Sequence, residues 1–205
     1  MYKLVRLLLA FAALVLPATA QARDIAVTIR DAAGHPVEDA VVTLDAPGRA
    51  RPPGHFVVTQ QNTMFMPFVL VIPVGSTVDF TNLDPFRHHV YSFSPPKKFE
   101  LKLFGRGEKR AVTFDKPGTI ALGCNIHDTM QAFIQVVDTA FAEKTGKDGR
   151  VVFHGAPAGG VKIAVWHPHL RAPGNQVTVA AAAGGNVSLA VGIKLRRPAP
   201  MNHDY

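Results

Sequence analysis

Several features that would point to common classes of protein are scarce in this chain of 205 residues. It has one cysteine, so no disulfide can form within the chain. No stretch contains the roughly 20 consecutive apolar residues that a membrane-spanning helix requires. Although the formal net charge is +7, no run of Lys and Arg is dense enough for a nucleic-acid-binding tract. These absences argue against an integral membrane protein and against a nucleic-acid target.

The first 22 residues have the pattern of an export signal. Lys3 and Arg6 form a positive n-region, residues 7–16 form an apolar h-region, and residues 18–20 (ATA) offer a small-x-small cleavage site. An uncleaved N-terminal anchor is the alternative, but ten apolar residues are too few to span a bilayer, which needs about 20. We therefore expect a soluble periplasmic protein. Removal of the signal lowers the formal net charge from +7 to +5, because Lys3 and Arg6 are lost.

The lone cysteine, Cys124, is informative in an exported protein. Cysteines in such proteins normally occur in pairs, so a single one forms an intermolecular disulfide, remains a free thiol or binds a metal. An exposed thiol in an oxidising compartment is prone to oxidation, whereas a metal-bound thiolate is protected. The cysteine count therefore favours a metal ligand.

Cys124 opens a short run of potential metal ligands, CNIHDTM (residues 124–130), which also contains His127 and Met130. Two further histidines, His88 and His89, lie upstream. Two imidazoles, one thiolate and one thioether are the ligands of a blue-copper electron-transfer site. Neighbouring side chains of an extended strand face opposite ways, so only one of His88 and His89 should reach the metal.

The pattern of the mature chain is that of an all-β protein. Short β-branched and aromatic runs recur between Gly, Pro, Asn and Asp, and no segment keeps a helical period. Strands are predicted at residues 25–29, 37–44, 65–72, 77–81, 88–93, 99–104, 110–114, 119–123, 131–137, 150–153, 161–166, 176–181 and 187–191. The central block, residues 56–138, has enough strands for a complete β-sandwich.

This central block resembles the cupredoxin family, the small blue-copper proteins. The resemblance lies in FMP (65–67), VGSTVDFTN (74–82), HHV (88–90), KPGT (116–119) and the spacing Cys124-x2-His127-x2-Met130. It implies a Greek-key β-sandwich that holds one type 1 copper, with His88, Cys124 and His127 as equatorial ligands and Met130 as the axial ligand. It also implies one-electron transfer through the edge of His127 and no enzymatic reaction.

The chain departs from the family pattern at two positions beside these ligands. The family usually has Asn directly after the first histidine, where this chain has His89, and commonly has Pro before the loop histidine, where this chain has Ile126. The family alignment and the alternation of side chains together favour His88 over His89 as the ligand.

Other interpretations of the same residues are weaker. A Cys–His nucleophile pair would need an orienting acid and an oxyanion site, and neither has a recognisable pattern here. Zinc prefers a harder fourth ligand than a thioether. Met64 and Met66 suggest a Cu(I)-transfer site, but alternation places both on one strand face, which favours core packing.

The remaining histidines lie outside the predicted copper site. We interpret them as surface or turn residues: His35, His55, His154, His167, His169 and His203.

Both ends of the chain resemble a second kind of β unit. Residues 31–44 are similar to the opening hairpin of carboxypeptidase-regulatory-like (transthyretin-like) modules, and residues 145–166 are similar to their closing half. Our hypothesis is that residues 24–46 pair with residues 139–191 in a split flanking β module that contains the inserted cupredoxin domain. The alternative is an elaborated cupredoxin with extra edge strands. Residues 195–205 are predicted to be disordered.

These expectations define a function. The leading hypothesis is a monomeric periplasmic electron carrier that docks with a redox protein partner. Its mildly basic surface either speeds encounter with an acidic partner or serves solubility alone. The alternatives are a copper-binding or delivery protein and an accessory module of a periplasmic oxidase.

Overall fold

A computed structural model describes residues 22–157, 159–181 and 185–193. Within these ranges the protein consists of β-strands, turns and one short 3-10 helix, Pro173–Asn175, so the all-β prediction is confirmed. None of the described helical residues forms a helix long and apolar enough to cross a membrane. The export signal up to residue 21, the predicted disordered tail and His203 lie outside the described residues.

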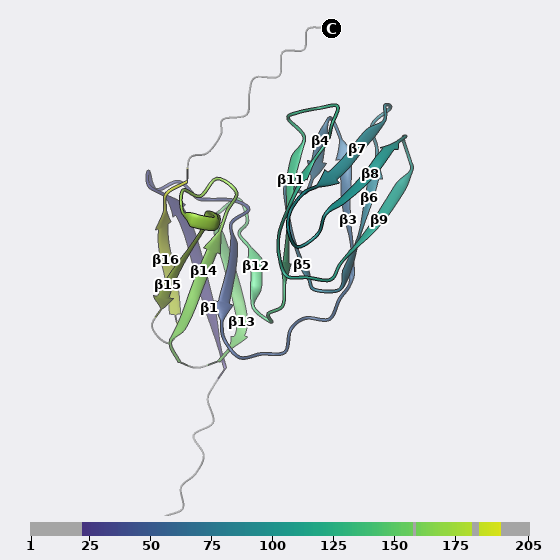
Figure 1. The fold of residues 1–205 in the computed structure, drawn as a ribbon. Coiled ribbons are helices and arrows are strands. Elements are labelled where there is room, and N and C mark those ends of the chain that lie inside the picture. The colour runs from purple at the N-terminus through teal and green to yellow at the C-terminus, as the bar shows by residue number, and fades with distance from the viewer. Residues whose placement is uncertain (1–21, 158, 182–184, 194–205) are drawn as a thin grey trace, which may run out of the picture.

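The central part of the chain forms a two-sheet β-sandwich (Figure 1). One sheet has the strand order β4-β3-β6-β9 and the other has the order β5-β11-β10-β7-β8. The strands are β3 (His55–Gln61), β4 (Met64–Met66), β5 (Val69–Pro73), β6 (Ser76–Asn82), β7 (His88–Ser92), β8 (Phe99–Phe104), β9 (Lys109–Phe114), β10 (Gly118–Gly123) and β11 (Gln131–Val137). In sequence they cover nearly all of the predicted block at residues 56–138.

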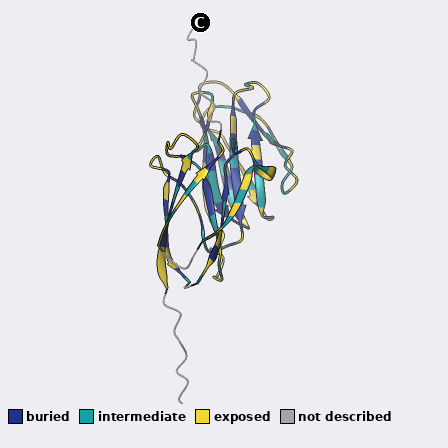
Figure 2. Ribbon diagram, turned by 90° about the vertical axis from the view of Figure 1, so that its left-hand side faces the viewer, coloured by how far each residue is buried: buried dark blue, intermediate teal, exposed yellow. Residues whose placement is uncertain are grey.

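Alternation of apolar and polar residues explains how these strands pack. In β6 every second residue is buried, and Val78 and Phe80 are inaccessible to solvent. Burial of this kind contributes about 25 cal/mol per Å² of apolar surface. Figure 2 shows buried residues within the sheets and exposed residues on the loops and on parts of some strands. The sandwich core comprises Val58, Phe65, Ile72, Val78, Phe80, Val90, Phe104, Phe114, Ile120, Leu122, Cys124, Met130, Ala132, Ile134 and Val136.

The two ends of the chain form a flanking unit with its own core. A three-stranded sheet has the order β13-β1-β16, and a four-stranded sheet has the order β12-β2-β14-β15. Its strands are β1 (Arg23–Asp31), β2 (Val41–Asp45), β12 (Ala142–Lys144), β13 (Arg150–Ala156), β14 (Val161–Trp166), β15 (Gln176–Ala181) and β16 (Gly185–Val191). No strand of this unit belongs to a sheet of the sandwich. Whether the unit is a carboxypeptidase-regulatory-like module stays a prediction.

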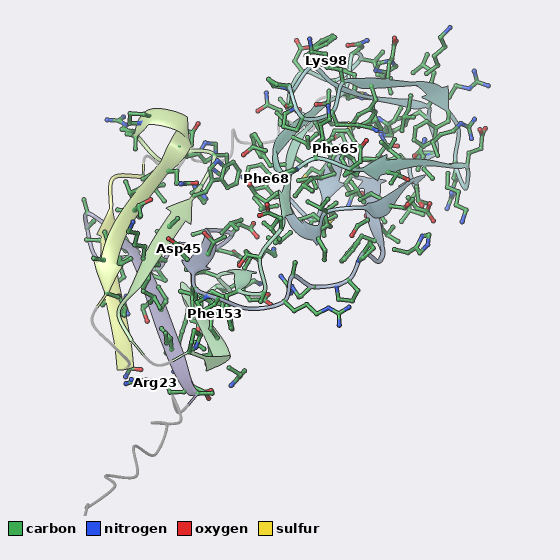
Figure 3. The ribbon with its side chains drawn as sticks, turned by 60° about the horizontal axis from the view of Figure 1, so that its bottom comes forward. Arg23, Asp45, Phe65, Phe68, Lys98 and Phe153 are labelled. Atoms are coloured by element: carbon green, nitrogen blue, oxygen red, sulfur yellow. The ribbon has the colours of Figure 1, made fainter. Side chains whose placement is uncertain are left out.

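A small aromatic cluster joins the two units. The ring centroids of Phe133 in the sandwich and Trp166 in the flanking unit are 5.7 Å apart, and those of Phe68 and His169 are 6.0 Å apart. Val41 and Val69 are buried in the same cluster. Figure 3 shows Phe68 on the side of the sandwich that faces the flanking unit. The two units therefore share a packed contact in addition to the connecting chain.

Two predicted strands differ most from the strands of the structure. The strand expected at residues 37–44 begins only at Val41, because the preceding segment forms a turn in which Asp39 has φ +60°. The run at residues 65–72 is divided into β4 and β5. Pro67 lies between them and has no N–H to donate to a strand ladder.

Two sequence interpretations of single residues were wrong, and a third was wrong in part. Met64 and Met66 do lie on one face of β4, but that face is exposed, and Phe65 between them is the buried residue. His167, interpreted as a surface or turn residue, begins a turn in which its carbonyl accepts the N–H of Leu170 at 2.9 Å, but its side chain is buried in the flanking unit. Its Nδ1 accepts a hydrogen bond from the backbone N–H of His169 at 3.2 Å.

Candidate metal centre

The candidate ligands converge because β7 and β10 are neighbours in the five-stranded sheet. Cys124 directly follows β10, and His88 is the first residue of β7. These two strands run antiparallel, with Tyr91 opposite Gly123, so the start of one lies beside the end of the other. His127 and Met130 lie in the short connection between β10 and β11. Two neighbouring strands of one sheet therefore fix the positions of His88 and Cys124.

Three donor atoms from these segments face one another. The distance from Cys124 Sγ to Nδ1 of His88 is 4.0 Å, and that to Nδ1 of His127 is 3.9 Å. All three atoms lie within 4.8 Å of one another. First-row metals bind thiolate and imidazole at about 2.0–2.3 Å, so one ion can contact the three atoms together. No carboxylate belongs to this cluster of described residues.

Met130 lies beside this cluster. Its side chain is 1% exposed and packs in the same core as Cys124. Its backbone N–H donates a hydrogen bond to the carbonyl of His127 at 3.0 Å, which closes the turn between the two residues. The structure thus places all four residues of the sequence prediction at one end of the sandwich. The ligand role of each remains a prediction.

His88 and His89 face opposite sides of the sheet. His88 is 0% exposed and directs Nδ1 toward Cys124. His89 instead places Nε2 2.9 Å from Oε1 of Glu100, and its Nδ1 has no hydrogen-bond partner among the described residues. The alternation of a strand explains this difference. His88 is therefore the histidine of this pair that the structure brings to the cluster.

Asp84, to which the sequence pattern gave no role, contacts His88 directly. Its Oδ2 lies 2.7 Å from Nε2 of His88, and the carboxyl group is buried. An acidic residue four positions before a candidate histidine ligand is a recognisable signal, because carboxylates often bind the second nitrogen of such histidines. In this chain Pro85, Phe86 and Arg87 lie between the two residues, and the segment is a loop and not a helix.

Burial and nearby charges affect two ionisable groups of the site. Burial lowers the pKa of His127, nearby His88 lowers it further, and Asp84 opposes both effects. Burial alone would raise the pKa of Asp84, but hydrogen bonds from His88 and from the backbone of Thr63 and Asn62 outweigh it. The pKa of Asp84 therefore lies below its ordinary value.

Gly123, which precedes Cys124, is required by a close approach. A Cβ atom at this position would lie 2.6 Å from the ring of Tyr91 on the adjacent strand. The Tyr91 ring is in turn 5.1 Å from that of Phe93, measured between centroids. Both aromatic residues line an open groove of about 450 Å³ that also reaches Cys124 and Met130. A side chain at residue 123 would therefore require the Tyr91 ring to move.

The donor set fits copper. Thiolate and thioether are soft ligands suited to Cu(I), and imidazole suits either oxidation state. Zinc sites with a comparable number of protein ligands usually add water or a harder donor in the fourth position. Here the buried neighbour of the three donors is the thioether residue Met130. The chemistry of the residues therefore favours copper over zinc.

A two-sheet sandwich with this cluster at one end is a cupredoxin-like fold. No family model matches the chain, and no curated protein sequence matches it.

Solved structures with similar folds include three kinds of copper-protein chain. The Cu-containing nitrite reductase (NirK) from Thermus scotoductus SA-01 is 31% identical over 55% of this chain and 28% of that chain, with a TM-score of 0.40. A purple cupredoxin from Nitrosopumilus maritimus is 22% identical over 40% of this chain and 98% of that chain, with a TM-score of 0.36. A reduced mutant of amicyanin is 20% identical over 47% of this chain and 98% of that chain, with a TM-score of 0.39.

These alignments cover about half of the chain or less, and the matching part corresponds to little more than a quarter of the nitrite reductase. The fold assignment therefore rests on the strand order and on the positions of His88, Cys124 and His127 in this protein.

Proposed function

We propose that this protein is a periplasmic blue-copper electron carrier with one type 1 copper per chain. The convergence of the Cys124 sulfur with one nitrogen each from His88 and His127 is the observation that carries the proposal. When bound, copper supplies a one-electron couple between Cu(II) and Cu(I). The protein performs no substrate chemistry in this role.

A rigid frame suits this function. Cys124 and His88 border paired strands, and Cys124, His88 and Met130 are buried in or beside a packed core. Side chains held in this way need little ordering when a metal binds, and they resist rearrangement between oxidation states. Cys124 is only 4% exposed, which limits the access of water to its sulfur. The frame thus supports rapid electron exchange rather than ligand exchange.

His127 provides the contact with solvent. It is partly exposed, and the exposed apolar side chains of Phe86 and Ile126 lie close by in space or sequence. The ring centroids of Phe86 and His127 are 5.6 Å apart. A partly apolar surface around one ligand allows a redox protein to dock at short range, and exposed Arg87 can steer an acidic partner.

The test is spectroscopy of the copper-loaded mature protein beside its Cys124→Ser variant. We expect an intense visible thiolate-to-copper band and narrow copper hyperfine splitting in electron paramagnetic resonance, both lost in the variant. A wild-type protein that binds copper while its thiol still reacts with an alkylating reagent would rule the proposal out.

A copper-delivery role is the second candidate, and exposed Met64 and Met66 favour it. Each side chain is 48% exposed on β4, and thioethers are Cu(I) ligands. The turn that precedes Met64 also contacts Asp84, the partner of His88. A delivery protein should release Cu(I) to a chelator more slowly when both methionines are changed to leucine. An electron carrier should show no such dependence and should give reversible voltammetry.

A further inference from the structure

We propose that Asp84 is a positioning residue that holds His88 with its Nε2–H bound and its Nδ1 directed at Cys124. The inference rests on the proposed copper function, because it assigns the residue that prepares one ligand before the metal arrives. Asp84 is not itself a candidate ligand, since the described cluster of possible ligands does not contain it.

The carboxylate of Asp84 is held on two sides. Oδ1 accepts the backbone N–H of Asn62 at 2.7 Å, and Oδ2 accepts that of Thr63 at 3.0 Å. Asn62 and Thr63 have φ of +54° and +55°, so they form the two-residue turn that joins β3 to β4. In this turn the two successive N–H groups point to one carboxylate. A loop of the four-stranded sheet therefore fixes the orientation of Asp84, whereas His88 belongs to the five-stranded sheet.

Asn82 fixes the backbone of the same segment. Its Oδ1 accepts the backbone N–H of Asp84 at 2.9 Å. Its Nδ2 donates to the carbonyls of Phe86 at 2.8 Å and Phe104 at 2.9 Å. Asn82 is completely buried, and its hydrogen bonds with Asp84 and Phe104 are shielded from water. Asn82 thereby connects two residues of the segment before His88, Asp84 and Phe86, with Phe104 at the end of β8.

The remaining contact is the one to His88. Oδ2 of Asp84 lies 2.7 Å from Nε2, and both groups are buried. A carboxylate bound to the second nitrogen of a histidine ligand fixes the tautomer and the ring orientation of that histidine. It also makes the other ring nitrogen more basic and so a stronger metal ligand. Burial of the charge is tolerable because three N–H groups bind it. A neutral acceptor would orient the ring without adding negative charge.

The chain contains a natural control in the neighbouring pair His89–Glu100. There too a carboxylate oxygen lies 2.9 Å from a histidine Nε2, but the pair faces the other side of the sheet. Asp84→Asn and Glu100→Gln therefore each replace a carboxylate that pairs with a histidine by a neutral amide. Only the first change lies next to the candidate ligand His88.

The experiment compares copper binding by the wild type, Asp84→Asn and Glu100→Gln, with chelator competition for Cu(I) and Cu(II). We expect Asp84→Asn to lower copper affinity about 10–100-fold. The loss should be greater for Cu(II), since the carboxylate charge favours the more positive ion. Glu100→Gln should bind within about twofold of the wild type, because its partner His89 is not at the site. Unchanged affinity in folded Asp84→Asn, or equal losses in both variants, would overturn the proposal.

A second measurement uses the metal-free wild type and so does not depend on a variant that folds. Nitrogen-15 NMR of the histidine rings should show a proton on Nε2 of His88. A proton on Nδ1 alone would contradict the role of Asp84. This outcome is distinct from failure of the copper function, which would appear as a wild-type protein without thiolate-bound copper.

Discussion

The sandwich and the flanking unit are both two-sheet β structures, but they use their interiors differently. The flanking core consists mainly of aliphatic side chains, and its buried polar residues are Thr145 and His167. The sandwich buries more polar residues among those that the structure describes: Gln60, Ser76, Asn82, Asp84, His88, His89, Ser92 and Gln135. Buried polar groups cost free energy unless they are hydrogen-bonded. The sandwich retains several of them at the end where chemistry is proposed.

This contrast shows that similar hydrogen-bond networks have a structural role in one unit and a proposed functional role in the other. In the flanking unit Thr145 has a purely structural role, because its hydroxyl donates to the carbonyl of Val37 and accepts the N–H of Ala40. In the sandwich, Asn82 and Asp84 form a comparable network that ends on His88. The same hydrogen-bonding chemistry therefore closes a turn in one unit and orients a candidate ligand in the other.

The largest expected effect separates two adjacent histidines. His88→Ala should abolish the visible copper band and tight copper binding, because it removes a donor that faces Cys124. His89→Ala should keep both, since His89 pairs with Glu100 on the other face. Absorption spectra and copper titrations of both variants provide the measurement. Loss in His89→Ala with retention in His88→Ala would reverse the ligand assignment.

The next largest effect tests whether the two cores are independent. Ile163 is fully buried in the flanking core, so Ile163→Ala should lower the free energy of unfolding by about 2–5 kcal/mol. The copper spectrum of the folded variant should stay unchanged, because no sheet is shared with the sandwich. Denaturant unfolding followed by fluorescence and by the copper band gives both quantities. A shifted copper spectrum would show that the flanking unit shapes the site.

A pH-dependent effect is expected from His167 in the flanking unit. Burial, aided by nearby His169, lowers the pKa of His167 from 6.5 to about 4. The unfolded chain therefore binds a proton between these values that the folded protein does not. The stabilisation is complete above pH 6.5 and is lost as the pH falls toward 4, by about 3 kcal/mol at most.

The measurement for this effect is the free energy of unfolding as a function of pH. His167→Gln should flatten the profile between pH 6.5 and 4, because it removes the group whose pKa differs between the folded and unfolded states. Equal slopes in the wild type and His167→Gln would show that another group titrates.

The smallest effect concerns the contact between the two units. The rings of Phe133 and Trp166 meet edge to face, a geometry worth about 0.5–1.5 kcal/mol beyond area burial. A double-mutant cycle with Phe133→Leu and Trp166→Leu should give a coupling energy in this range. A coupling energy of zero would mean that this ring contact does not stabilise the junction between the two units.

The grouping of the candidate ligands could be predicted from the sequence more fully than their surroundings, while their ligand roles stay a prediction. Cys124, His127 and Met130 are close in sequence, so a short loop between two strands suffices to bring them together. The choice of His88 over His89 rested on strand alternation and the family alignment. Asp84 was missed because its contact with His88 depends on the turn at Asn62 and Thr63, which comes from a different sheet. The acidic residue four positions before His88 was a local signal, but the long-range hydrogen bonds that orient its carboxylate leave no pattern in the sequence.

The errors at Met64, Met66 and His167 have one physical cause. Alternation establishes which side chains share a face, but it does not establish which face another layer covers. On β4 that ambiguity was decided by Phe65, which fills the sandwich core and leaves both methionines outside. At His167 the fold of the flanking unit covers a residue that a turn-like sequence would leave exposed.

The amino-acid sequence by itself determined the donor types, their spacing and the all-β character, because these follow from residue chemistry and local periodicity. The tertiary structure decided which nitrogen of His88 faces the sulfur, which carboxylate binds the other nitrogen, and where the two cores meet. Those properties depend on strands that are distant in sequence and adjacent only after the sheets have formed.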